Sequence, residues 1–289
     1  MGELAIELKD VGYAYPDGSV ALDDVNMKIM RGERVAVLGP NGAGKSTLLM
    51  LMGGLFMPSK GEVSVLGMAM GDKNLHQIRK SVGLVFQDPD DQLFSPTLWE
   101  DVAFGPLNLG LPEEEVSTRT REALRSVRLE GYGDRPPHHL SAGEKKRAAV
   151  ATVLAMQHEI LILDEPTANL DPKSRIELIG LINKLCKNGN MTLIIATHDV
   201  NLIPDIADRV FVLSGGRILN EGSVRDVLLN SRLMDEANLE SPIIGRLFRL
   251  IAEKNKGVVS EPIPLTFDEA LYEIDRLIWH RKSNSERDS

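Results

Sequence analysis

The sequence predicts an α/β fold built on a mostly parallel sheet that helices cover on both faces. The first observation is a set of short apolar segments at residues 160–163, 192–196 and 210–213, separated by helical or turn-rich stretches. Parallel strands that are buried on both faces have this composition. The second observation is the run Gly39–Thr47, which directly follows another short strand pattern at residues 34–38.

The run GPNGAGKST matches the phosphate-binding pattern G-x-x-x-x-G-K-[ST]. Its glycines allow the backbone to fold around a phosphate, and the helix that follows adds its positive dipole end. Lys45 reaches the outer phosphates as a point charge, and the Ser46 hydroxyl can bind Mg²⁺. Taken alone, the run could also be interpreted as an ordinary glycine-rich turn between a strand and a helix. We predict that it binds nucleotide through Gly39, Pro40, Asn41, Gly42, Ala43, Gly44, Lys45, Ser46 and Thr47.

Composition narrows the class of protein. The chain has 289 residues, 43% of them hydrophobic, and a formal net charge of −9, which argues against a broad nucleic-acid surface. Its single cysteine, Cys186, excludes an internal disulfide and suits a reducing cytosol. The first residues lack a signal-peptide pattern, and the longest apolar run, 47–57, is too short to span a bilayer. We expect any membrane role to go through a partner.

Two alternating segments, 4–8 and 25–29, flank a turn at 15–18 and predict an antiparallel β subdomain with one buried face. Further strands are expected at 61–65 and 82–86.

Between these strands and the segment 160–163, the pattern predicts a helical insertion over about residues 88–150. It includes a charged helix at 113–128 and the start of a helix at 145–155, and another helix is expected at 174–186.

We expect one domain over residues 1–240 and a small C-terminal helical extension over 241–289. In the extension, apolar residues from Ile243 to Ile251 share a helix face. A second helix should begin at the capping box of Thr266 and Glu269. From Arg281 onward the chain is polar, and we expect it to be disordered.

Polar side chains follow several strands, where open α/β sheets bind ligands. Asp164 ends one strand and can hold Mg²⁺, while Glu165 can act as a general base on water. Gln87 follows the strand 82–86 and can reach the metal or the water, and His198 follows 192–196. Each of these residues also has a purely structural interpretation: the acidic pair could start a helix, Gln87 could be a polar residue at a strand end, and His198 could be a structural histidine.

Two further motifs lie at predicted helix starts. Ser141 and Glu144 form a capping box, and the same helix N-terminus is suited to an anion. The segment Asn169–Asp171 either forms a contact between subunits or caps the helix that begins near Pro172.

In order, these motifs resemble those of ABC transporter ATPase subunits over residues 3 to about 235. The resemblance implies a P-loop NTPase of RecA-like fold that uses ATP and Mg²⁺, with Lys45, Gln87, Glu165 and His198 in catalysis. Mg²⁺ would be held by Ser46, Gln87 and Asp164. It implies that the Walker A loop is Gly39–Thr47, the Walker B aspartate Asp164, the catalytic glutamate Glu165, the Q-loop glutamine Gln87, the signature motif Ser141–Glu144, the D-loop Asn169–Asp171 and the switch histidine His198.

The resemblance also implies further nucleotide contacts. Tyr15 resembles the aromatic residue that stacks on adenine, with Tyr13 as the competing candidate. Two positions depart from the family's usual LSGGQ, since Ala142 replaces glycine and Glu144 replaces glutamine. The capping bond is expected to turn Glu144 back toward the Ser141 backbone. The implied nucleotide contacts outside Gly39–Thr47 are Tyr15, Ser141, Gly143, Glu144 and Asp171.

Residues 87–110 are similar to the energy-coupling factor group, most closely to its cobalt-type ATPase subunit. In that family this region holds the coupling helices of a transmembrane partner. Apolar side chains would lie outward as anchors for this partner, unless they fill the insertion's own core. Acidic side chains would pair with basic residues of the partner. The expected anchors are Leu93, Phe94, Leu98, Trp99, Phe104 and Leu107, and the acidic residues are Asp88, Asp90 and Asp91.

The resemblance implies an assembly at the cytoplasmic face of the cell membrane. Two ATPase chains would sandwich two ATP molecules, as a homodimer or with a related second subunit, beneath a transmembrane scaffold subunit and a substrate-binding membrane subunit. The chain would be peripheral and would not bind nucleic acid. The transported substrate would be cobalt or nickel, or alternatively a vitamin. We expect no metal site at His138 and His139, which follow two prolines without a carboxylate or cysteine at ligand spacing.

Two other classes are disfavoured. Soluble ABC ATPases of DNA repair or ribosomes usually carry paired cassettes or a long coiled coil, and the sequence shows neither pattern. A regulator without ATPase activity would be expected to lack catalytic residues, whereas Lys45, Asp164, Glu165 and His198 are all present.

Overall fold

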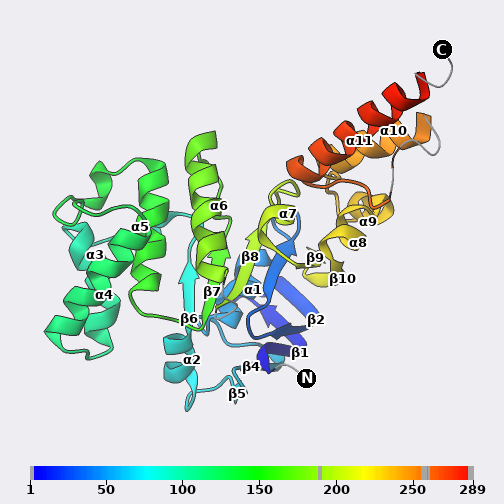
Figure 1. Ribbon diagram of the computed structural model, residues 1–289. Helices are drawn as coiled ribbons and strands as arrows, with labels where there is room; N and C mark the ends of the chain where they lie inside the picture. Colours follow the sequence, from blue (N-terminus) through cyan, green and yellow to red (C-terminus); the bar gives the residue numbers. More distant parts are fainter. Residues whose placement is uncertain (1–2, 188–190, 255–258, 260, 286–289) are drawn as a thin grey trace.

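The computed structural model describes residues 3–187, 191–254, 259 and 261–285, arranged as shown in Figure 1. Its largest sheet has six strands in the order β10-β9-β3-β8-β7-β6. All neighbouring pairs are parallel except β9 and β10, so the predicted mostly parallel sheet is confirmed. The strands are β3 (Arg34–Leu38), β6 (Val82–Val85), β7 (Ile160–Asp164), β8 (Thr192–Thr197), β9 (Arg209–Ser214) and β10 (Arg217–Ser223).

A second, four-stranded antiparallel sheet confirms the predicted β subdomain. Its first two strands are longer than the predicted 4–8 and 25–29. A tight turn between them, closed by Tyr15 N–H donating to Ser19 O at 2.9 Å, lets pairing continue almost to the loop. The strands are β1 (Leu4–Ala14), β2 (Val20–Met30), β4 (Lys60–Val65) and β5 (Met68–Ala69).

Helices cover both faces of the six-stranded sheet, and the helical insertion lies beyond its β6 edge (Figure 1). In the insertion, α3 begins at a capping box of Thr97 and Glu100. The insertion comprises η1 (Pro89–Asp91), α3 (Leu98–Asn108), α4 (Glu113–Ser126), η2 (Pro137–His139) and α5 (Ala142–Leu154). The other helices of residues 1–240 are α1 (Lys45–Met52), α2 (Leu75–Ser81), α6 (Pro172–Cys186), α7 (Ile203–Ile206), α8 (Val224–Leu228) and α9 (Ser231–Glu236).

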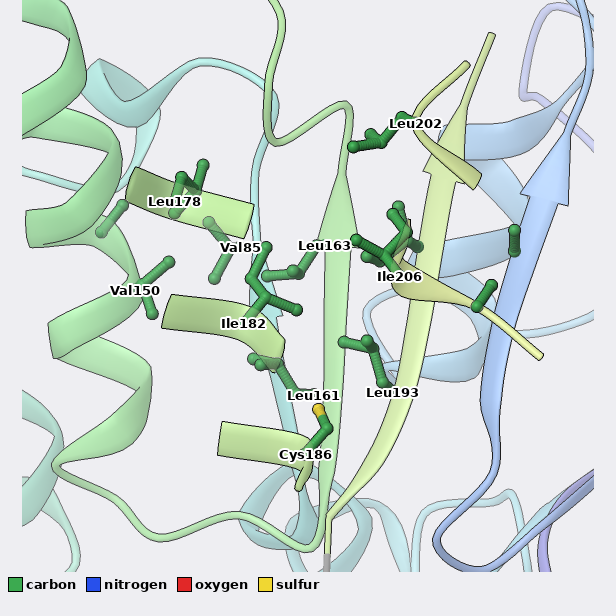
Figure 2. Packing of buried hydrophobic residues seen from close by; sticks show 14 of the residues in the cluster. Val85, Val150, Leu161, Leu163, Leu178, Ile182, Cys186, Leu193, Leu202 and Ile206 are labelled. Atoms are coloured by element: carbon green, nitrogen blue, oxygen red, sulfur yellow. The ribbon is translucent and has the colours of Figure 1, made fainter. Parts of the chain in front are cut away.

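Strand β7 shows why the strands are almost continuously apolar. Leu161 and Leu163 belong to the cluster that includes residues of α5 and α6, seen in Figure 2. Ile160 and Ile162 belong to the cluster on the other face, with α1 and the antiparallel sheet. All four are at most 1% exposed, and burying each such side chain contributes about 1.5–3 kcal/mol. This packing fixes the end of β7, where the acidic pair follows.

The C-terminal extension contains α10 (Ile243–Lys254) and α11 (Phe267–Ser285). The predicted capping box is confirmed, since Glu269 N–H donates to Thr266 Oγ1 at 3.2 Å. Arg225 of α8 donates to Glu269 at 2.6 Å and links the start of α11 to α8. The disorder predicted from Arg281 is wrong for residues 281–285, because α11 continues through them, and residues 286–289 lie outside the described residues.

Candidate nucleotide and catalytic site

A cavity of about 650 Å³ lies over the phosphate loop. Its walls come from that loop, from the segments after β6 and β7, and from the turns before β2 and after β9. The fold thus brings Tyr15, Gln87 and the acidic pair to the loop, as the motifs predict. The lining residues are Tyr15, Ser19, Val20, Ala21, Asn41, Gly42, Gly44, Lys45, Ser46, Thr47, Gln87, Asp164, Glu165, Gly215 and Gly216.

The phosphate loop has the geometry that its glycines permit. Gly44 precedes α1 in the left-handed region, with φ of 100°, and a Cβ there would lie 2.6 Å from Ala21 O. Lys45 is buried, and its Nζ donates to the carbonyls of Gly39 at 2.8 Å and Pro40 at 3.1 Å. The backbone therefore holds the ammonium at the cavity wall.

Asp164, the last residue of β7, has the character of a Mg²⁺ ligand. The side chain is 5% exposed and hydrogen-bonds Ser46, yet its Oδ1 is buried without a hydrogen-bond partner in the described part of the chain. Burial raises the pKa of this carboxyl, and the hydrogen bond from Ser46 opposes the shift. An orphaned carboxylate oxygen beside a hydroxyl, with Gln87 on the same cavity, fits the oxygen ligands that Mg²⁺ prefers.

Glu165 lies where three segments meet. Its Oε1 is 2.8 Å from His198 Nδ1 and 3.4 Å from Lys45 Nζ, and its Oε2 accepts from the Thr197 hydroxyl at 3.2 Å. Glu165 is 6% exposed, whereas the His198 side chain is 52% exposed. The carboxylate is thus held between the loop lysine and the histidine after β8, an arrangement that suits a general base.

The two candidate adenine-stacking residues, Tyr15 and Tyr13, have different surroundings. Tyr15 is 37% exposed, lines the cavity, and its hydroxyl is 2.7 Å from Thr47 Oγ1. Tyr13 stacks on Phe56, with ring centroids 5.0 Å apart and planes 3° apart. Of the two rings, only that of Tyr15 lines the cavity, which supports the assignment to Tyr15.

Replacing Tyr15 by Leu is expected to raise the Kd for ATP about tenfold, within the range given by losing one base–aromatic stack. Fluorescence titration with ATP measures this effect. Tyr13→Phe is the matched control, because it keeps the stack on Phe56, and it should bind ATP normally. An unchanged Kd in Tyr15→Leu would remove the ring from adenine binding.

The signature segment and Asp171 are placed away from this cavity. Ser141 N–H donates to a Glu144 carboxylate oxygen at 2.8 Å, which confirms the expected turning back of Glu144 and lowers the pKa of its carboxyl. Ser141 and Ala142 are exposed at the N-terminus of α5, and Gly143 packs against Ser174.

Asp171 caps α6, where it accepts from the N–H groups of Lys173 at 3.0 Å and Ser174 at 3.1 Å. This geometry matches the capping interpretation of the segment, and neither Asp171 nor the signature residues predicted to bind nucleotide are among the described residues that line the cavity.

Residues 87–110 divide between surface and core. Phe94 and Phe104 are 66% and 49% exposed, with ring centroids 5.1 Å apart, and Leu107 is 56% exposed. Asp101, which is buried, accepts from the N–H groups of Phe94 at 3.1 Å and Ser95 at 2.9 Å and holds this loop in place.

The other expected anchors do not lie outward. Leu93 and Leu98 are buried in the core, and Trp99 packs against it. Leu98 and Trp99 form the start of α3, whose first turn thus faces the core. Asp90 already has a basic partner, Lys145, at 2.6 Å. The outward apolar surface is therefore smaller than expected. We call Phe94, Phe104 and Leu107 the aromatic patch.

Two contacts of Glu165 were not predicted from the sequence. The Thr197 hydroxyl binds Glu165, and Lys146 of α5 is buried with its ammonium near the same residue. A signal for Lys146 exists, because Ala149, Val150 and Val153 follow at helical spacing and place it on the buried face.

The model of the ABC transporter family matches residues 22–168. The chain is 48% identical over 275 residues to the energy-coupling factor transporter ATP-binding protein EcfA of Methanocaldococcus jannaschii, covering 94% of this chain and 96% of that protein. It is 47% identical over 253 residues to EcfA of Methanococcus maripaludis, covering 87% and 91%.

Solved structures agree with these relatives. CbiO1 of Clostridium perfringens, described as part of the ABC transporter complex cbiONQ, superposes with a TM-score of 0.73 at 41% identity, covering 86% of this chain and 99% of that one. The cassette MJ0796, solved as a dimer bound to ADP and Pi, gives 0.69 at 33%, covering 76% and 99%. The P-loop NTPase fold, the loop cavity and these relatives together place the chain in the ABC transporter family as an ATP-binding, ATP-hydrolysing subunit.

Proposed function

We propose that this chain is the ATPase subunit of an energy-coupling factor importer and works as a homodimer that closes around two ATP molecules. The observation that carries the proposal is the incompleteness of the site. The cavity supplies the loop, the acidic pair and Tyr15, but no residue of the signature segment Ser141–Glu144 lines it, and Ser141 and Ala142 are exposed. A second copy would bring its Ser141 and Gly143 to the γ-phosphate. The relative MJ0796, which was solved as a dimer bound to ADP and Pi, supports a dimeric arrangement.

Within one site, the roles follow from the contacts. Lys45 supplies positive charge to the outer phosphates. Its ammonium lies 3.4 Å from the Glu165 carboxylate and so holds that carboxylate near the position of the γ-phosphate. Glu165 accepts a proton from the attacking water, and His198, 2.8 Å away, orients the carboxylate. Ser46, Asp164 and Gln87 would hold Mg²⁺, which when bound neutralises charge on the phosphates.

The membrane attachment would use the aromatic patch. The segment 87–110, which carries the patch, also lines a cavity of about 600 Å³ through Gln87, Asp88 and Asp91 among others, so a partner helix that enters this cavity would touch Gln87. This placement would couple opening of the dimer to a transmembrane scaffold. No helix in residues 3–187, 191–254 and 261–285 is long and apolar enough to cross a membrane. We place the chain peripherally at the cytoplasmic face, bound through this scaffold and its substrate-binding membrane subunit.

The cargo that we propose is cobalt or nickel. Two things support it: the similarity of residues 87–110 to the cobalt-type subunit, and the likeness to CbiO1 of a cbiONQ complex. The cargo would pass through the membrane subunits, and the described residues contain no group of three or more His, Cys, Asp or Glu that could hold a metal.

Uptake of radiolabelled Co²⁺ and Ni²⁺ tests the cargo, in cells that express the chain with its proposed membrane subunits. Uptake should require ATP hydrolysis by the chain. ATP-dependent uptake of a vitamin such as biotin or riboflavin, with neither ion transported, would refute the metal cargo and leave the ATPase role intact.

Phe94→Ser with Phe104→Ser is expected to shift the chain from the membrane fraction to the supernatant when it is co-expressed with its scaffold, because the patch loses its aromatic anchors. ATP binding should change less than about twofold, since both rings lie outside the nucleotide cavity. Leu219→Ser is the control, because it removes an exposed apolar side chain on β10, at the opposite edge of the sheet from β6. Normal membrane recovery of the double variant would mean that the patch is not the interface.

A further inference from the structure

Lys146 is a buried cation with a defined set of partners. It lies in α5, five residues after the signature serine, and is 5% exposed. Its Nζ donates to the main-chain carbonyl of Gln87 and, at 3.4 Å, to that of Glu165. A buried ammonium is costly unless such bonds compensate its lost hydration, so these carbonyls determine where it can lie.

The carbonyl of Glu165 belongs to a residue in an unusual conformation. Its φ of 42° lies in the left-handed region, which non-glycine residues rarely adopt and which persists where surrounding contacts enforce it. Glu165 N–H donates to Ala196 O at 2.9 Å, and Lys146 binds the carbonyl on the other side. The peptide groups on both sides are therefore held, and this backbone sets the direction in which the carboxylate leaves the chain.

The surroundings of Lys146 are acidic. Burial lowers the pKa of its ammonium, and Asp88, Asp164 and Glu165 act in the opposite direction. Lys45 lies on the cavity side of Glu165, so the acidic pair has one buried lysine from the phosphate loop and another from the signature helix. Only Lys45 lines the nucleotide cavity; Lys146 lines the neighbouring cavity beside Gln87.

We infer that Lys146 is a positioning residue for catalysis, which joins the signature helix to the Gln87 and Glu165 backbones and holds the Glu165 carboxylate in its hydrolytic position. This inference rests on the proposed role of Glu165 as the base. Since α5 also begins with the signature segment, a displacement of that helix would move Lys146 and with it the Glu165 backbone.

Replacing Lys146 by Met tests the inference, because Met has a similar length and removes both donated bonds. We expect kcat for ATP to fall on the order of 10²-fold, the cost of a base displaced by about 1 Å. The Kd for ATP should change less than about twofold, because Lys146 lies outside the nucleotide cavity. Phosphate release and ATP titration give the two values, and thermal unfolding without nucleotide checks that the variant is folded.

Two matched variants separate positioning from general damage. Lys146→Arg retains N–H donors and should recover most of the turnover. Lys145→Met removes the neighbouring lysine, whose ammonium pairs with Asp90 rather than with the catalytic backbone, and should leave kcat within about twofold. If the Met variant loses its cooperative unfolding transition, the comparison is made with Lys146→Gln, whose shorter side chain should also lose turnover while binding ATP.

The decisive measurement is made in a Glu165→Gln background. If Lys146 acts through Glu165, adding Lys146→Met should change the residual turnover less than about twofold, because effects through one group do not add. If Lys146→Met lowers the residual kcat of Glu165→Gln by the same factor as it lowers that of the unchanged protein, the inference is overturned. A normal kcat in Lys146→Met, when Glu165→Gln alone is slow, would overturn it as well. Normal turnover in Glu165→Gln alone would instead refute the proposed base.

Discussion

A Glu165→Gln variant is expected to hydrolyse ATP on the order of 10²–10⁴ times more slowly than the unchanged protein, the range for loss of general-base catalysis. The amide preserves size and can still bond to Thr197 and His198, which now lie 3.2 and 2.8 Å from the carboxylate. It cannot take a proton from water. ATP should still bind, because Lys45 and the loop backbone are unchanged. Phosphate release under steady-state conditions measures the turnover.

The same variant should stay dimeric while ATP is bound. With hydrolysis slowed, the γ-phosphate continues to bridge the loop of one chain and the signature segment of the other. Size-exclusion chromatography with Mg-ATP should show a dimer peak that disappears with Mg-ADP. Adding Ser141→Arg, which fills the predicted anion site with bulk, should abolish that peak. A protein that binds ATP but elutes identically with both nucleotides would refute ATP-dependent dimerisation of the isolated chain.

Lys45→Ala is expected to lower ATP turnover by at least 10²–10³-fold, roughly the cost of removing one donor that stabilises developing charge. The phosphates lose their nearest buried cation, so ATP binding should weaken as well. The fold should survive, because the Glu165 carboxylate keeps its contacts with Thr197 and His198. Thermal unfolding gives a direct test: saturating ATP should raise the Tm of the unchanged protein and leave that of the variant nearly unmoved.

Lys45→Arg is the control for charge alone. The guanidinium keeps the charge but cannot reproduce the compact ammonium that the carbonyls of Gly39 and Pro40 hold at 2.8 and 3.1 Å, so it should also be nearly inactive. Normal ATP turnover by Lys45→Ala would remove the loop from the mechanism.

The local motifs were predictable because each is a short, contiguous pattern. Nine consecutive residues specify the phosphate loop, and capping boxes at Ser141 and Thr266 require only a partner three positions later. The alternation of apolar strands and helices likewise predicted the sheet, since the strands pair in parallel and are buried on both faces. One local prediction failed, because α11 runs on through residues 281–285.

The sequence by itself therefore determined the nucleotide loop, the strand-end carboxylates and the class of fold. Only the tertiary structure decided which residues of 87–110 lie outward, and that Tyr15 rather than Tyr13 lines the cavity. It also revealed Lys146, whose partners stand 59 and 19 positions away. The physical reason is that burial and hydrogen bonding depend on segments that meet only after folding, whereas strand, turn and cap patterns depend on near neighbours in the chain.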